Sequence, residues 1–209
     1  MKRLREIIGI LIGLQVSGLG TAILFRLGAG SAPGAMITDG VSTFFNISYG
    51  IAGFCVNMFF LLLLFFTFPR IIGIGTVMAT FFFGIFIDIG TFLIRGIPME
   101  TYPLLIQGGF LLLGSLLGAA GLGIYIAEDA GIGALDAPAI IGEKKYGLDF
   151  KICRWTQDVL LVIIGLVLGA GWGIGTIVAT VLNAPIIRGV VAFRRKQKLK
   201  QYHKNLQDH

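Results

Sequence analysis

The stretch GIGTVMAT at residues 73–80 returns as GIGTIVAT at residues 173–180, and this pair decides the interpretation of the whole chain. Six of the eight positions are identical at an offset of 100 residues. Because a repeated segment implies a repeated structural unit, the pair predicts a duplicated fold. Gly-rich apolar sequence also matches itself by chance, so the prediction needs further blocks in the same order.

Three further pairs of segments lie in that order upstream. They are FNISYGIAGFCVN (45–57) with YGLDFKICRWTQD (146–158), SGLG (17–20) with AGLG (120–123), and Gly28 and Gly30 with Gly131 and Gly133. Their offsets drift from 103 to 101 residues, as small loop insertions and deletions would leave between two copies. We therefore predict a first repeat over residues 1–100, a second over 101–193 and a basic tail over 194–209.

The composition places this repeat in a membrane. Of the 209 residues, 56% are apolar and only 13% are charged, which excludes an ordinary soluble domain. A hydrocarbon core about 30 Å thick needs roughly 20 apolar residues in a helix. Six such runs are present, at about 6–26, 50–68, 72–95, 104–127, 150–170 and 174–193. The fold class predicted is all-α integral membrane, with six transmembrane helices.

Each copy holds three of these runs, and three is an odd number. The second copy must therefore enter the bilayer from the opposite face, as two inverted three-helix repeats. This architecture is characteristic of secondary transporters, whose two halves meet around a site near the bilayer midplane.

The basic residues predict the orientation. The net charge is +6, with clusters at Lys2–Arg5 and in the tail from Arg194, and cytoplasmic loops carry such an excess. Both termini are expected in the cytoplasm, leaving only Arg26 and Arg95 near the other face. These basic residues lie at the expected membrane boundaries. We therefore expect anionic lipid as their partner and no binding of nucleic acid.

A Gly-rich segment follows the first run of each copy, at residues 26–45 and 128–145. Both are too apolar for solvent loops and too short to span, which favours short buried or re-entrant helices. Helix N-termini aimed inward would offer amide donors to an anionic or zwitterionic group. The candidate binding residues here are Gly28, Gly30, Ser31, Gly131, Gly133 and Asp136. The alternative is that the glycines only permit tight packing.

Charged and polar residues inside the runs supply the other candidates. Asp88 lies well inside the third run and is either a proton or cation site or a structural carboxylate. Arg154 and Asp158 are four residues apart and share a helix face. With Asp136 and Asn57 they form either a substrate-orienting cluster or a gate, unless Arg154 and Asp158 are only an ion-pair lock.

Catalytic patterns are absent from the sequence. Both histidines, His203 and His209, lie in the tail, so no His/Cys cluster suits a metal. No Gly-Lys-Ser/Thr ending makes a P-loop, and no Ser-His-Asp set falls within the spans. We expect no enzyme activity and no cofactor.

The second half resembles the YczE/YitT-type bacterial multi-pass membrane proteins. The resemblance rests on GIGALDAPAIIG (131–142), ICRWTQD (152–158) and GIGTIVAT (173–180). In the first half GIGT matches, whereas GAGSAPGAM (28–36) lacks the Pro-Trp-Asp often found in that family. The resemblance implies a bacterial cytoplasmic membrane protein and leaves the activity open.

The leading hypothesis is a secondary transporter or exporter of a small polar or anionic metabolite. The main rival is the substrate-binding membrane subunit of an energy-coupling-factor importer, which needs an ATPase partner. A third alternative is a regulatory membrane protein without transport. Assembly into a homo-oligomer is a further possibility. Gly114 with Gly118 and Gly165 with Gly169 allow close helix contacts, either within one chain or between chains.

Overall fold

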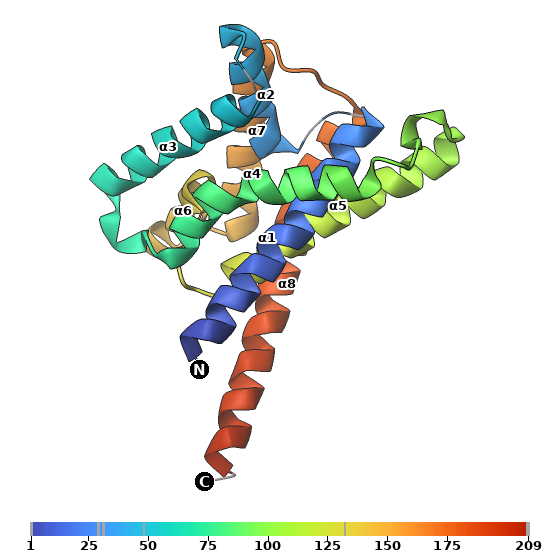
Figure 1. The fold of residues 1–209 in the computed structure, drawn as a ribbon. Coiled ribbons are helices and arrows are strands. Elements are labelled where there is room, and N and C mark those ends of the chain that lie inside the picture. Colours follow the sequence, from blue (N-terminus) through green and yellow to red (C-terminus); the bar gives the residue numbers. More distant parts are fainter. Residues whose placement is uncertain (1, 29, 31, 48, 132, 208–209) are drawn as a thin grey trace.

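The computed structural model describes residues 2–28, 30, 32–47, 49–131 and 133–207. These residues form helices, turns and loops, and no strand occurs among them (Figure 1). The helices are α1 (Lys2–Leu27), α2 (Pro33–Phe45), α3 (Tyr49–Thr67), α4 (Ile74–Ile94), α5 (Leu104–Ile126), α6 (Ala137–Tyr146), α7 (Phe150–Val167) and α8 (Ile174–Gln207). Short 3-10 turns η1 (Pro69–Ile71), η2 (Met99–Thr101) and η3 (Ala134–Asp136) lie between them.

The helices begin and end where the local sequence dictates. Pro33 opens α2, where its missing amide hydrogen costs nothing. Asn46 after α2 and Gly147 after α6 adopt the left-handed conformation that ends a helix, with φ of 51° and 67°. The short helices α2 and α6 occupy the two Gly-rich segments, so both segments are helical in part, as predicted.

Four helical segments are long and apolar enough to cross a membrane within the described residues. They are Arg3–Leu27, Ile74–Ile94, Leu104–Ile126 and Ile174–Lys200. The apolar part of α3, Ile51–Thr67, is shorter, and α7 has 18 residues. The chain is therefore a helical protein with four candidate membrane spans, and α3 and α7 match the other two predicted runs in position.

Glycines bring α1 and α5 into direct backbone contact. Gly13 lies against the carbonyl of Gly121, whereas Gly20, further along α1, lies against Gly114 and Gly118, earlier in α5. The two helices are therefore antiparallel. A Cβ on Gly20 would overlap the α5 backbone, so the close crossing depends on the small residue.

Each helix of this pair has a parallel neighbour from its own half. The contacts that show it are Gly18 with Phe86 and Gly90 with Ala22 for α1 and α4, and Gly123 with Val190 and Glu128 with Arg194 for α5 and α8. The main core lies where α1, α5, α6 and α8 meet. The parallel pair of α1 and α4 therefore runs antiparallel to the parallel pair of α5 and α8.

The repeated GIGT sequences join the two halves. Gly30 has φ of 100° and lies against Gly173 at the start of α8. Gly131 has φ of 110° and lies against Gly73 before α4, where the Gly75 amide donates to the Ala130 carbonyl at 2.8 Å. A side chain at either of these two turns would meet both an unfavourable φ and the backbone of the other half. The glycines at positions 73 and 173, which the two GIGT sequences share, therefore lie at backbone contacts between the two halves.

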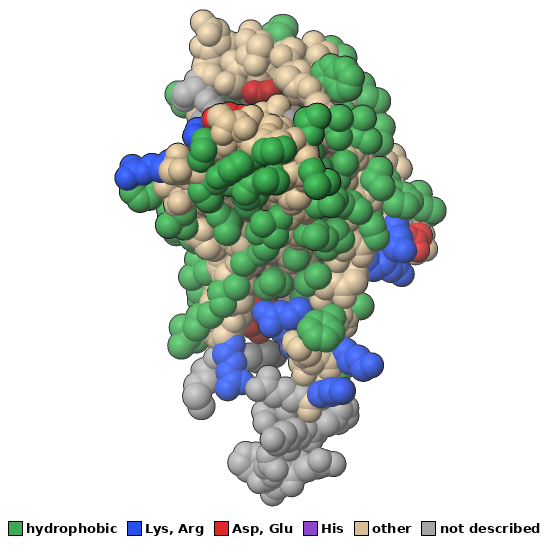
Figure 2. Space-filling view, turned by 90° about the vertical axis from the view of Figure 1, so that its right-hand side faces the viewer, with side chains coloured by type: hydrophobic (Ala, Val, Ile, Leu, Met, Phe, Trp, Pro, Cys, Tyr) green, Lys and Arg blue, Asp and Glu red, His purple; other side chains and the backbone are tan. Residues whose placement is uncertain are grey.

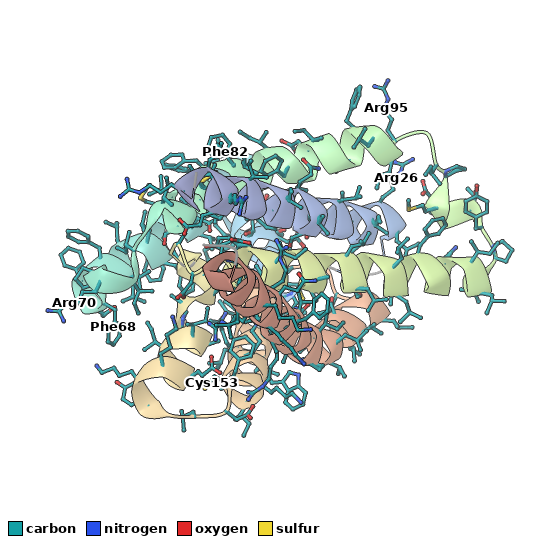
Figure 3. The ribbon with its side chains drawn as sticks, turned by 90° about the horizontal axis from the view of Figure 1, so that it is seen from below. Arg26, Phe68, Arg70, Phe82, Arg95 and Cys153 are labelled. Atoms are coloured by element: carbon teal, nitrogen blue, oxygen red, sulfur yellow. The ribbon has the colours of Figure 1, made fainter. Side chains whose placement is uncertain are left out.

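The surface agrees with a membrane protein. Figure 2 shows a broad belt of hydrophobic side chains, with most Lys and Arg of this face toward its lower end. Both termini leave at the lower end of Figure 1, where α8 extends beyond the other helices. Figure 3 shows Arg26 beside Arg95 and places Arg70 on the opposite side of the molecule; an Arg26 guanidinium nitrogen donates to the Arg95 carbonyl at 3.4 Å.

Candidate functional site

A cavity with a volume of about 460 Å³ lies between helices of both halves. Its wall comes from α1, α2, α3, α4, α5, α7 and α8, together with the turn at η3. Five of the predicted site residues line it, namely Asn57, Asp88, Gly133, Asp136 and Arg154. Pockets of this size hold small molecules in other proteins.

A buried charge cluster closes one side of the cavity. A terminal guanidinium nitrogen of Arg154 donates to Asp136 Oδ1 at 2.6 Å, and Arg154 Nε lies 3.1 Å from Asp158 Oδ1. The side chains of Arg154, Asp136 and Asp158 are only 5%, 13% and 0% exposed. The predicted i,i+4 pair is therefore present, and the tertiary fold adds Asp136 from the middle of the Gly-rich segment 128–145. Removal of any one of these three side chains would leave a buried charge without its partner.

Two amide side chains make hydrogen bonds at or beside the cluster. Asn183 of α8 donates to Asp158 Oδ2 at 3.5 Å. Gln157 of α7 accepts from the Ala139 amide at 2.9 Å and donates to the Leu135 carbonyl at 2.8 Å. Gln157 therefore fixes η3 and the first turn of α6 against α7.

The start of α6 differs from the expected anion site. Asp136 occupies the N-cap position, but its side chain makes no cap hydrogen bond. The Ala137 amide donates to the Gly133 carbonyl at 3.0 Å, Pro138 has no amide hydrogen, and the Ala139 amide is bound by Gln157. The expectation that this helix N-terminus offers free donors is wrong, because the fold has already satisfied them.

Several polar groups at the cavity have no partner among the described residues. The Tyr125 hydroxyl and Ser115 Oγ are buried without a hydrogen bond, in side chains of residues only 1% and 2% exposed. Asp88 is exposed on α4, and the described chain supplies no ion pair to its carboxylate. Asn57, by contrast, donates to the Gly53 carbonyl at 2.9 Å.

The remaining predicted site residues lie away from the cavity wall. Gly28 follows α1 with φ of 63°, and Gly30 and Gly131 form the turns that contact Gly173 and Gly73. Ser31 lies outside the described residues. Gly30 and Gly131 thus lie at close backbone contacts, as the alternative of a packing role predicts. Gly133, in contrast, lines the cavity.

Sequence reasoning missed Tyr125, Ser115 and Asn183. Each stands alone in an apolar run, and a polar residue within a predicted span is the signal that could have marked it. Many polar residues lie in the predicted spans. The pairing of the helices decides which of them share a cavity, and the repeat did not predict which helix faces pack together.

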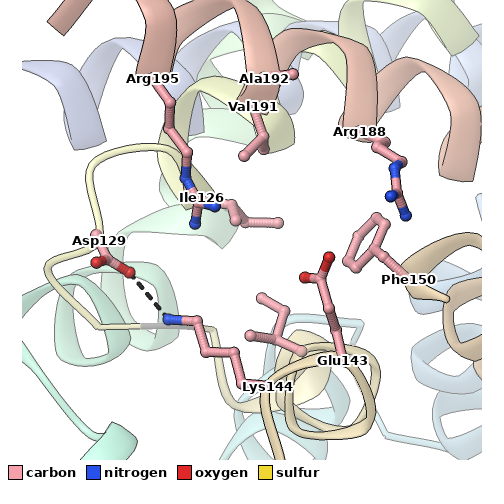
Figure 4. A pocket seen from close by; sticks show the side chains of 10 residues that line it. Ile126, Asp129, Glu143, Lys144, Phe150, Arg188, Val191, Ala192 and Arg195 are labelled. Carbon is pink, nitrogen blue, oxygen red and sulfur yellow. Dashed lines mark hydrogen bonds and ion pairs between the residues drawn. The ribbon is translucent and has the colours of Figure 1, made fainter. Parts of the chain in front are cut away.

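A second cavity of about 200 Å³ lies between α6 and α8. Figure 4 shows Lys144 bonded to Asp129, while Arg188 and Arg195 extend from α8 into the pocket. Lys144 lies 3.1 Å from Asp129, and Arg188 lies 3.2 Å from Asp149. These charges are exposed and mostly compensate one another, as long cationic side chains do at a membrane boundary.

A third charge cluster joins α8 to the end of α5. The Glu128 side chain is 5% exposed and binds Arg194 at 3.2 Å and Lys198 at 2.7 Å. It fits against Gly9 of α1, where any side chain would overlap it. The basic tail is thus bound to the helical core at its first turns.

Comparisons with known proteins place the chain in a family. It is similar to an uncharacterized protein of Haemophilus influenzae, with 25% identity over 184 residues that cover 88% of this chain and 80% of the relative. No solved structure matches it. Neither finding carries the YczE/YitT name, so that resemblance stays a prediction. The profile of DUF6198, a family of unknown function, matches residues 4–191, and the chain therefore belongs to the DUF6198 family.

Proposed function

We propose that this protein is a secondary transporter that moves a small polar molecule by alternating access between two inverted repeats. The observation that carries the proposal is the cavity of about 460 Å³, which lies between helices of both halves and has buried polar groups in its wall. Secondary transporters bind substrate at such a repeat interface, next to interrupted helices.

The order of the helices supports the inverted repeat. In each half a long helix is followed by a short one and then by two long ones, α1 to α4 and α5 to α8. The first helices of the two halves, α1 and α5, are antiparallel, while each lies parallel to the last helix of its own half. A unit duplicated and inserted upside down has these relations.

The orientation follows from six spans. We propose that α3 and α7 complete the set, which puts both termini in the cytoplasm of a bacterium and the η2 turn outside. Arg26 then lies at the outer boundary, 3.7 Å from Glu100, whereas the Glu128 cluster lies at the cytoplasmic boundary.

The two ends of the α1 and α5 pair are held differently. At the outer end Arg26 and Glu100 are 36% and 50% exposed, and such pairs contribute about 0–1 kcal/mol. At the cytoplasmic end the buried Glu128 carboxylate binds two cations at once. The cytoplasmic end is therefore the more firmly closed in this state.

Cysteine accessibility tests the proposal. In a background with Cys55→Ser and Cys153→Ser, Ser115→Cys places a thiol in the cavity, where the native residue is 2% exposed. Thr101→Cys on η2 and Glu143→Cys on α6 are exposed references for the outer and cytoplasmic faces.

A membrane-impermeant maleimide is applied to sealed vesicles of both orientations. We expect Ser115→Cys to react from both sides, Thr101→Cys only from outside and Glu143→Cys only from the cytoplasmic side. Reaction of Ser115→Cys from a single side would refute alternating access. Two-sided reaction that requires ATP and a copurifying ATPase would assign the chain to the importer subunits instead.

A further inference from the structure

Acidic side chains outnumber basic ones in the wall of the cavity of about 460 Å³. Asp88 and Asp136 supply two carboxylates to the wall, and Arg154 supplies the one guanidinium there among the described residues. Asp136 and Asp158 already share Arg154, which leaves Asp88 without a cation. A charge within a membrane-spanning helix normally has a partner or a function.

The positive charge at the cavity is already paired with carboxylates. Arg154 contacts one carboxylate through Nε and another through a terminal nitrogen. The Ala139 amide at the start of α6 is bound by Gln157. An anionic ligand would meet two carboxylates and a guanidinium that already pairs with Asp136 and Asp158, and like charges at short range are repulsive.

Acceptors, in contrast, remain free. Arg154 binds Asp136 through Oδ1, so Oδ2 has no partner among the described residues. A Cβ built on Gly133 would stand 2.9 Å from Asp136 Oδ2 and 3.4 Å from the Tyr125 hydroxyl, so the missing side chain leaves the space beside both oxygens open. Ser115 Oγ is a further buried acceptor without a partner at the same cavity.

The rest of the wall suits an apolar group. Phe54, Phe81 and Phe83 line the cavity, and Phe54 and Phe81 lie with ring centroids 6.4 Å apart across α3 and α4. Aromatic faces attract cations and also cover short hydrocarbon chains. The cavity therefore combines free carboxylate and hydroxyl oxygens with aromatic surface.

We infer that the cavity binds a small organic cation, a primary or secondary ammonium with a short apolar part, through the carboxylates of Asp88 and Asp136. The inference rests on the proposed transport function and names its substrate class. Ammonium hydrogens donate to Asp136 Oδ2 and to the Tyr125 hydroxyl, while Asp88 supplies the second negative charge and the phenylalanines contact the carbon chain.

Titration calorimetry of the purified full-length protein tests this class with three probes of one size, namely butylammonium, butyrate and butanol. We expect saturable binding of butylammonium that is at least about tenfold tighter than that of butyrate or butanol, because only the cation gains the charge interaction.

Two variants locate the binding. Asp88→Asn keeps the shape of an exposed side chain and should weaken butylammonium binding by about tenfold. Gly133→Ala is compatible with the backbone, since φ is −52°, but its methyl group crowds Asp136 Oδ2 and should weaken binding as well. Glu143→Gln removes an exposed carboxylate from α6, outside this cavity, and should leave binding unchanged.

The outcomes separate this inference from the transport proposal. Tighter binding of butyrate, no binding of butylammonium, or equal weakening by Glu143→Gln and Asp88→Asn would each overturn the cation assignment, while two-sided labelling of Ser115→Cys would still support transport. Cation binding with one-sided labelling would support the ligand class and refute alternating access.

Discussion

Replacement of Arg154 by Ala should strongly destabilise the protein. The guanidinium is 5% exposed and is the cation that serves both Asp136 and Asp158 in the structure. Its removal leaves two carboxylates in a poorly solvated wall, and breaking a buried pair of this kind costs about 3–5 kcal/mol. For a chain of this length each kcal/mol lowers the melting temperature by about 2–4 °C, so we expect a loss of about 10 °C.

The assay is thermal unfolding in detergent, followed by the fluorescence of Trp155 and Trp172. The variant that combines Arg154→Met with Asp136→Asn and Asp158→Asn removes all three charges together and should recover most of the lost stability, because no buried charge remains unpaired.

Arg188→Ala is the matched control. Arg188 also binds an aspartate, Asp149, but both side chains are nearly half exposed, so its loss should cost about 0–1 kcal/mol. Equal effects of Arg154→Ala and Arg188→Ala, or a triple variant no more stable than Arg154→Ala, would refute the buried cluster.

Three further substitutions, one of them with a matched control, test the packing of the helices. Gly20→Ala should destabilise by about 1–3 kcal/mol, because its methyl group overlaps the α5 backbone, whereas Gly109→Ala on α5, with open space around it, should gain up to about 1 kcal/mol in thermal unfolding. Gln157→Leu leaves the Ala139 amide and the Leu135 carbonyl unpaired, which costs about 1–3 kcal/mol and should speed hydrogen exchange in the first turn of α6; unchanged exchange would contradict the clamp. Glu128→Gln removes the charge that binds the start of the tail and should speed tryptic cleavage after Arg194, and an unchanged cleavage rate would show that the cluster does not hold α8.

The long helices were predictable because their causes are local. Apolar runs of sufficient length, broken by Pro69, Pro98 and Pro103, specify helices and their ends without reference to the rest of the chain. The pair of Arg154 and Asp158 was predictable for the same reason, since a spacing of four residues places both side chains on one helix face. The helical tail continues α8, because nothing in residues 194–207 interrupts the helix.

The sequence alone determined that this chain is helical and apolar, and it predicted an internal repeat, because composition, spacing and self-similarity can be read without knowing the fold. Only the tertiary structure decided that Gly30 and Gly131 contact the GIGT turns while Gly133 lines the cavity, and that Tyr125 and Ser115 line the same cavity as Asp136. The reason is that antiparallel contact of α1 and α5 brings together residues about 100 positions apart, and their register depends on backbone fit along the whole helix pair.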